Sequence, residues 1–203
     1  MGFAQWLRAQ FGCPTGFWGA LAGMIMAHRR QNRERNLWTI SLLDIQQDDR
    51  VLEIGFGPGV AIQEISKIVV NGFVVGIDHS QAMVRQAEKR NAAAIRDGRV
   101  KLRLGSVSAL PVFSEPFDKC FAVNAIHHWD EPIERLKGLR QLLGPSGLIA
   151  ITEQPRSRGA TDETAQEIGK EIVAALTKAG FSQIRIETKK MKPVSAVCAL
   201  GIK

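Results

Sequence analysis

One stretch of the chain combines the features of a turn that lets a ligand approach the backbone. The largely apolar run Val51–Ile54 predicts a buried parallel strand, and three glycines follow at alternate positions, Gly55, Gly57 and Gly59. Glycine tolerates positive φ and leaves room against the main chain. A second apolar run ends in Asp78. Strand, turn, helix, strand and acid in this order are typical of a nucleotide-ribose site in a doubly wound sheet.

The identity of the nucleotide depends on two residues around this turn. The dinucleotide fingerprint asks for a further glycine at the sixth position from Gly55, where this chain has Val60. Glu53, two residues before Gly55, is not part of that fingerprint. The run from Glu53 to Gly59 instead resembles the E-x-G-x-G-x-G motif of S-adenosylmethionine-dependent methyltransferases with the Rossmann-like fold. The resemblance implies S-adenosylmethionine as methyl donor and S-adenosylhomocysteine as product, and leaves a dehydrogenase as a distant alternative.

The same resemblance implies roles at the carboxyl ends of the first three strands. Glu53 orients the turn and reaches the cofactor's amino group through water, and Asp78 accepts bonds from the ribose hydroxyls. Met83 covers the adenine, with core filling as the alternative. Ser106 stands where family members often have an Asp that bonds adenine, so that contact loses its charge. The expected cofactor residues are Glu53, Gly55, Phe56, Gly57, Gly59, Asp78, His79, Met83, Ser106, Val107 and Asn124.

Two adjacent histidines follow the fourth strand. The segment Asn124–Pro132 resembles the His-His segment of small-molecule methyltransferases and lacks the Asn-Pro-Pro-Tyr of enzymes that methylate adenine or glutamine amino groups. His127 or His128 could take a proton from the acceptor, because neutral imidazole titrates near the working pH. Both could equally be structural, since transfer from a sulfonium is favourable and positioning can suffice.

The pattern of the whole chain predicts an α/β protein with one domain over residues 1–203 and a Rossmann-like core over 46–203. The resemblance implies a doubly wound, mostly parallel seven-stranded sheet with helices on both faces and the last strand antiparallel between strands five and six. Strand 100–104 alternates apolar and basic residues, which favours an edge. The expected strands are 50–54, 73–77, 100–104, 117–123, 148–152, 181–187 and 194–202. The expected helices are 59–69, 81–94, 132–143 and 162–178.

Residues 1–45 are rich in aromatic side chains and predict two or three N-terminal helices. We expect this segment to be the lid and the acceptor wall, with Trp18, Asn36 and Trp38 contacting the acceptor beside His127. The bland alternative is that these helices only pack on the sheet. The stretch 153–161 is expected to be too short and polar to wall off a pocket.

Charge and cysteine content bear on which ligands and which cellular compartment the sequence predicts. The net charge is +7, but the basic residues are spread out, and the densest cluster, His28–Arg35, is interpreted as a solvated helix face, which argues against nucleic acid. Three distant cysteines match no metal spacing, so we expect no metal and a reducing cytoplasm. The acceptor is expected to be small and apolar or aromatic, methylated at O, N, S or C. Phospholipid N-methylation at a membrane surface and a catalytically silent binding protein remain alternatives.

Overall fold

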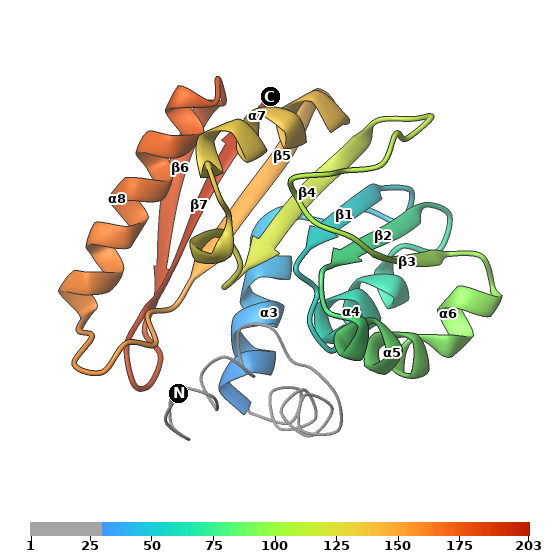
Figure 1. Ribbon diagram of the computed structural model, residues 1–203, viewed down its shortest axis with the longest axis horizontal. Coiled ribbons are helices and arrows are strands. Elements are labelled where there is room, and N and C mark those ends of the chain that lie inside the picture. Colours follow the sequence, from blue (N-terminus) through green and yellow to red (C-terminus); the bar gives the residue numbers. More distant parts are fainter. Residues whose placement is uncertain (1–29) are drawn as a thin grey trace.

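The computed structural model describes residues 30–203, which form a seven-stranded sheet in the order β3-β2-β1-β4-β5-β7-β6 (Figure 1). The strands are β1 (Arg50–Ile54), β2 (Phe73–Asp78), β3 (Val100–Leu104), β4 (Phe117–Val123), β5 (Leu143–Glu153), β6 (Ser182–Lys189) and β7 (Ala196–Ile202). The helices are α3 (Arg30–Leu43), α4 (Val60–Ile68), α5 (Gln81–Arg90), α6 (Ala92–Arg96), α7 (Pro132–Leu142) and α8 (Asp162–Lys178), with the short 3-10 helix η1 (Ile126–His128) after β4.

The strand order and directions confirm the expected sheet. The strands β1 to β5 pair in parallel, and β7 runs antiparallel to both β5 and β6, between which it lies. Strand β3 forms one edge, as its alternating pattern predicted. Parallel strands point the same way, so the carboxyl ends of β1, β2 and β4 meet at one edge, where open α/β sheets bind ligands.

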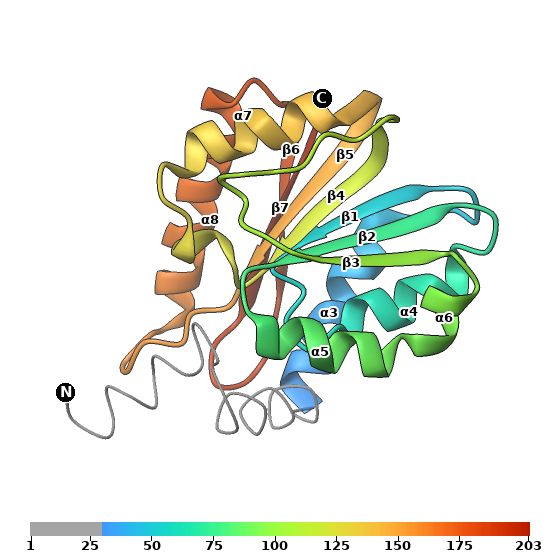
Figure 2. The same cartoon turned by 45° about the vertical axis from the view of Figure 1, so that its right-hand side comes forward.

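Helices cover both faces of the sheet (Figure 2). Helices α3, α4, α5 and α6 pack on one face, and the apolar cluster between them and the sheet includes the fully buried Ile62 and Val74. Helices α7 and α8 cover the other face, where Leu136 and Leu176 join the second cluster. The two-sided burial explains why β1 and β2 read as continuous apolar runs.

Helix α3 belongs to this packed core. Its Ile40 and Leu43 are buried in the cluster under α4, and Trp38 packs against the same cluster. Helix α3 contacts α4, β4 and β5. Residues 30–45 are therefore part of the core face, and the rest of the expected lid, with Trp18 in it, lies outside the described residues.

Two elements differ from their expected bounds by more than two residues. The single helix expected over 81–94 is divided at Asn91, whose side-chain Nδ2 donates to the carbonyls of Ala87 and Gly59, at 2.8 and 3.2 Å. Strand β5 begins at Leu143 rather than 148, because Leu143 already pairs with Phe117 before a register shift. Ser146, at φ 62°, lies in the irregular stretch of this strand between Leu143 and Leu148.

Cys120 and Cys198 are buried small residues, and burial raises the pKa of the Cys198 thiol to about 12. Cys13 lies outside the described residues. Within residues 30–203, no helix is both long and apolar enough to cross a membrane.

We predict that Leu43→Ala lowers the free energy of unfolding by about 3 kcal/mol, because the side chain is fully buried between α3 and the sheet. Urea unfolding measures the loss. The matched control is Val112→Ala, which removes apolar atoms from a residue that is 94% exposed and should change stability by less than about 0.5 kcal/mol. A loss below about 1 kcal/mol for Leu43→Ala would contradict the placement of α3 in the folded core.

Candidate cofactor and acceptor site

The turn after β1 has the backbone that its glycines predicted. Gly55, Gly57 and Gly59 all have positive φ, at 75°, 53° and 73°. The Gly55 N–H donates to the carbonyl of Ile77 at 2.8 Å, and the Gly57 N–H donates to Asp78 Oδ2 at 2.8 Å. These two bonds hold the turn against the end of β2.

Gly57 and Gly59 have different structural roles in this turn. A Cβ on Gly57 would meet no atom within 4 Å, so this position faces open space along the cavity. A Cβ on Gly59 would lie 2.7 Å from the Cβ of Ala87, so Gly59 permits the close packing of α4 and α5. Gly59 was expected at the cofactor, but it is not among the residues that line the cavity.

Asp78 is a carboxylate fixed before any ligand binds. Oδ1 accepts from the Ser80 N–H at 2.8 Å and Oδ2 accepts from the Gly57 N–H. Burial raises the pKa of Asp78, while these two hydrogen bonds and the neighbouring His79 act in the opposite direction. Each oxygen keeps a further acceptor position, which suits a ribose with two hydroxyls.

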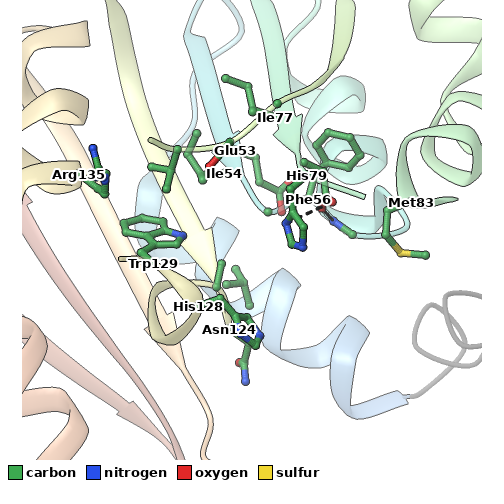
Figure 3. Close-up of a pocket in the computed structure, with 18 of the residues that line it drawn as sticks. Glu53, Ile54, Phe56, Ile77, His79, Met83, Asn124, His128, Trp129 and Arg135 are labelled. Atoms are coloured by element: carbon green, nitrogen blue, oxygen red, sulfur yellow. Dashed lines mark hydrogen bonds and ion pairs between the residues drawn. The ribbon is translucent and has the colours of Figure 1, made fainter. Parts of the chain in front are cut away.

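A cavity of about 720 Å³ lies along this edge of the sheet (Figure 3). In the close-up, Glu53, Phe56, His79 and Met83 lie on one side, and His128 and Trp129 lie across from them. Of the residues expected at the cofactor or acceptor, those that line the cavity are Asn36, Glu53, Gly55, Phe56, Gly57, Asp78, His79, Met83, Ser106, Val107, Asn124 and His128. Among the expected contacts, Trp38 and His127 do not line it.

Glu53 is a buried acid on the wall of the cavity. It is 2% exposed, and its Oε2 has no hydrogen-bond partner. Burial, with a smaller contribution from the charge of Asp78, raises the pKa of Glu53 to about 8. An unpartnered carboxyl oxygen on a cavity wall fits a ligand that brings a hydrogen-bond donor, such as the ammonium group of S-adenosylmethionine.

Met83 and Ser106, which were both expected at the adenine, line the cavity. Met83 is 2% exposed on α5, behind the N-cap Ser80. The hydroxyl of Ser106 is 2.8 Å from that of Ser108 and accepts from the Ser108 N–H at 3.2 Å. Its hydroxyl therefore stabilises its own turn first and offers a weaker contact than the carboxylate of the family pattern.

Asn124 forms the wall between the cofactor cavity and a second cavity. Its φ of 51° is left-handed, a conformation that Asn adopts more readily than most residues. Its Nδ2 donates to the Gln154 carbonyl at 2.9 Å, and its Oδ1 accepts from the Gln154 N–H at 3.2 Å. Both polar atoms of the side chain thus tie the end of β4 to the end of β5.

The second cavity, of about 420 Å³, contradicts the expectation that residues 153–161 cannot wall off a pocket. Its wall includes Pro155, Arg156 and Ser157 from that stretch, together with apolar residues of η1, α7 and α8. Those apolar residues are Ile126, Pro132, Ile168, Ile172 and Ala175. The stretch suffices because α8 supplies the opposite wall. Asn124 and Arg156 line both cavities, which therefore adjoin.

The two histidines face different cavities. His127 lines the second cavity, where its Nδ1 lies 3.0 Å from Glu153 Oε2 and 3.1 Å from Oε1. His128 lines the cofactor cavity, and burial, followed by the charge of His127, lowers its pKa. The ring centroids are 3.9 Å apart. A carboxylate at Nδ1 is the arrangement that leaves Nε2 of His127 as the proton acceptor.

Sequence reasoning missed three polar residues at this site. Arg35 was assigned to a solvated face, yet it is 2% exposed and lines the cofactor cavity. Glu153 and Gln154, both buried, directly follow the core of β5. The rule that residues after parallel strands meet at the site could have found these two, whereas no local pattern distinguishes Arg35 from Arg33.

Fold and site together define a nucleotide-binding α/β protein of the Rossmann-like class. A family model described as "Methyltransferase domain" matches residues 51–147. YdaC, an uncharacterised methyltransferase of Bacillus subtilis, is 36% identical over 183 residues, which cover 90% of this chain and 98% of YdaC. The chain therefore belongs to the class I S-adenosylmethionine-dependent methyltransferases.

More distant similarities agree with this family. The 27-O-demethylrifamycin SV methyltransferase of Amycolatopsis mediterranei is 25% identical over 76% of this chain and 58% of its own length. The solved structure of the N-methyltransferase NodS from Bradyrhizobium japonicum, in complex with S-adenosylhomocysteine, superposes with a TM-score of 0.71. That match covers 98% of this chain and 97% of NodS at 14% identity, so it is a likeness of fold alone.

We predict that two glycine substitutions separate binding from folding. Gly57→Ala should weaken S-adenosylhomocysteine binding about 10-fold, because the methyl group enters the cavity, at a cost of about 1 kcal/mol in stability. Gly59→Ala should cost about 2 kcal/mol or more, because a clash with Ala87 adds to the backbone strain. Calorimetric titration and urea unfolding measure the two effects. Equal losses of stability in the two variants would be evidence against this division.

We also predict a pH dependence of stability that originates in Glu53. Its pKa is about 8 in the folded protein and near 4.5 when exposed, so between these values the folded state holds more protons than the unfolded state. Stability of the ligand-free protein should therefore fall as the pH rises across this interval. Glu53→Gln removes this contribution, and its free energy of unfolding should fall less steeply than that of the wild type. Parallel slopes in urea unfolding at a series of pH values would contradict the prediction.

Proposed function

We propose that the protein transfers the methyl group of S-adenosylmethionine to a hydroxyl or amine of a small apolar or aromatic acceptor held in the second cavity. The observation that carries this proposal is the pairing of His127 with Glu153 on the wall of an apolar cavity that adjoins the cofactor cavity. The Amycolatopsis relative, a methyltransferase of 27-O-demethylrifamycin SV, supports an acceptor of the small-molecule class.

The lining of the second cavity supports an acceptor with an apolar body and one reactive polar group. Five of its lining residues from η1, α7 and α8 are apolar, and its polar lining residues include Asn124, His127 and Glu153. An acceptor that buries its apolar part against α8 would present its polar group at Asn124, beside the cofactor cavity. Holding both reactants in this orientation is the largest contribution that the protein makes to such a reaction.

In this proposal Nδ1 of His127 carries the imidazole proton and Nε2 carries the lone pair. With Nδ1–H donated to Glu153, the lone pair of Nε2 is free to accept the acceptor's proton. Bound S-adenosylmethionine supplies an electrophilic methyl on a positively charged sulfur, which leaves as the neutral thioether of S-adenosylhomocysteine. As the acceptor's oxygen or nitrogen bonds to the methyl carbon, its proton passes to Nε2, and the carboxylate of Glu153 stabilises the imidazolium. Glu153 is in this scheme a positioning residue.

We predict that His127→Gln lowers kcat about 100-fold or more with a hydroxyl acceptor, and that Glu153→Gln lowers it less. A panel of small phenols, alcohols and secondary amines, followed by release of S-adenosylhomocysteine, first identifies the acceptor. The loss should fall on kcat with little change in cofactor affinity.

The control is Glu167→Gln, which alters an exposed carboxylate on the same helix α8 and should leave kcat within about twofold, since Glu167 does not line the second cavity. Wild-type kcat in His127→Gln would exclude it as the base. A loss confined to His128→Gln would transfer that role to His128, whose lowered pKa also keeps its imidazole neutral.

A further inference from the structure

Arg35 is a buried cation on the α3 side of the cofactor cavity. It is 2% exposed, although its neighbours in the basic cluster Arg30–Arg35 are mostly at the surface. Burial and then the charge of Arg156 lower its pKa to about 9, against a smaller opposite effect of Glu153. The guanidinium is therefore still charged at neutral pH.

The partners of this guanidinium are neutral amides. Nη1 donates to Gln154 Oε1 at 2.6 Å, Nη2 donates to Asn32 Oδ1 at 2.5 Å, and Nε is buried without a partner. Among residues 30–203, no carboxylate forms an ion pair with Arg35. Buried charges in proteins are ordinarily paired, so this positive charge is available to an anionic ligand.

Gln154 holds the guanidinium in a fixed position. Its Nε2 donates to the carbonyls of Val194 at 2.7 Å and Lys192 at 3.3 Å, so the amide orientation is determined and Oε1 faces Arg35. Its backbone is tied to the side chain of Asn124 in both directions. A cation that is oriented before the ligand arrives loses little conformational freedom on binding.

The cavity therefore carries two unpaired buried groups of opposite character. Glu53 offers an unpartnered carboxyl oxygen, and Arg35 offers unused N–H donors. Asp78, at the end of β2, faces the nucleoside end, whereas Gln154, beside Arg35, follows β5, which is three strands further along the sheet. At the usual strand spacing this is about 14 Å. A ligand that spans the cavity from Asp78 would bring its far end to Arg35.

We propose that Arg35 binds the carboxylate of the methionine part of S-adenosylmethionine, with Glu53 receiving the ammonium group of the same amino acid. The guanidinium of Arg35 complements the carboxylate of the cofactor's α-amino-acid end, and the unpartnered carboxyl oxygen of Glu53 accepts a hydrogen bond from its ammonium group. The planar fork of the guanidinium matches the geometry of a carboxylate. The inference concerns only the cofactor and does not depend on which acceptor is methylated.

We predict that Arg35→Met, in the full-length protein, weakens S-adenosylhomocysteine binding about 10- to 100-fold, because a charge-assisted interaction is lost. Binding of 5′-methylthioadenosine should stay within about twofold, since it keeps the adenosine and thioether but lacks the amino and carboxylate groups. Calorimetric titration measures both ligands without any acceptor. The matched control is Arg33→Met on the same helix, which removes a half-exposed arginine paired with Glu64 and should affect neither ligand.

Comparison of the two ligands distinguishes the loss of a contact to the amino-acid end from a general disturbance of the cavity. Equal losses for both ligands would mean that Arg35 only maintains the cavity, and unchanged S-adenosylhomocysteine affinity would overturn the proposal outright. If thermal melting shows that Arg35→Met does not fold, Arg35→Lys replaces it. The compact ammonium keeps the charge without the fork, so an intermediate loss confined to S-adenosylhomocysteine is expected and the same two results would overturn the proposal.

Discussion

The hydrogen bond from the Gly57 N–H to Asp78 Oδ2 is the constraint on which the site depends. It joins the turn after β1 to the end of β2 and is possible only because Gly57 adopts a left-handed conformation. The Gly55 N–H extends the junction by donating to Ile77. At the next strand pair the Asn124 N–H donates to Thr152, so the ends of β4 and β5 are joined in the same manner. The cavity is consequently walled by backbone whose position the sheet itself determines.

The cavity concentrates buried polar groups that are incompletely paired in the absence of a ligand. Among residues 30–203, one carboxyl oxygen of Glu53 has no hydrogen-bond partner and the buried Arg35 forms no ion pair with a carboxylate. Groups of this kind cost stability in the free protein, and a ligand that satisfies them recovers that cost on binding. Proteins tolerate such groups chiefly at functional sites, where a fixed and unsatisfied charge provides affinity and orientation.

The elements that the sequence predicted well are those whose local pattern has one physical solution. Two-sided burial makes β1 and β2 continuous apolar runs, and alternate glycines ahead of Asp78 require a tight turn beside a ligand. The N-terminal cluster had no such signature. Arg35 and Arg33 lie two residues apart on one helix, and only the packing of α3 against β4 and β5 decides that the first is buried and the second is not.

The role of residues 153–161 likewise could not be predicted from their local sequence. The segment is short and polar, and its composition alone indicates a surface loop. Its role as a cavity wall depends on α8, which packs against β5 and β7 and lies opposite Pro155 and Arg156. Tertiary packing between segments distant in sequence thus forms the second cavity, whereas the glycine turn of the cofactor cavity follows from one contiguous motif.

Asn124 lines both cavities and links the ends of β4 and β5 between them. Its side chain is committed to Gln154 through both polar atoms, so it is poorly placed to act as a base or to move with the acceptor. Gln154 in turn positions Arg35 through its Oε1 and follows Glu153, which contacts His127. One short segment after β5 thereby couples the cation of the cofactor cavity to the histidine of the second cavity. A disturbance at Gln154 would shift donor and acceptor sides at once, so methyl transfer in this protein depends on the end of β5 as much as on the glycine turn of β1.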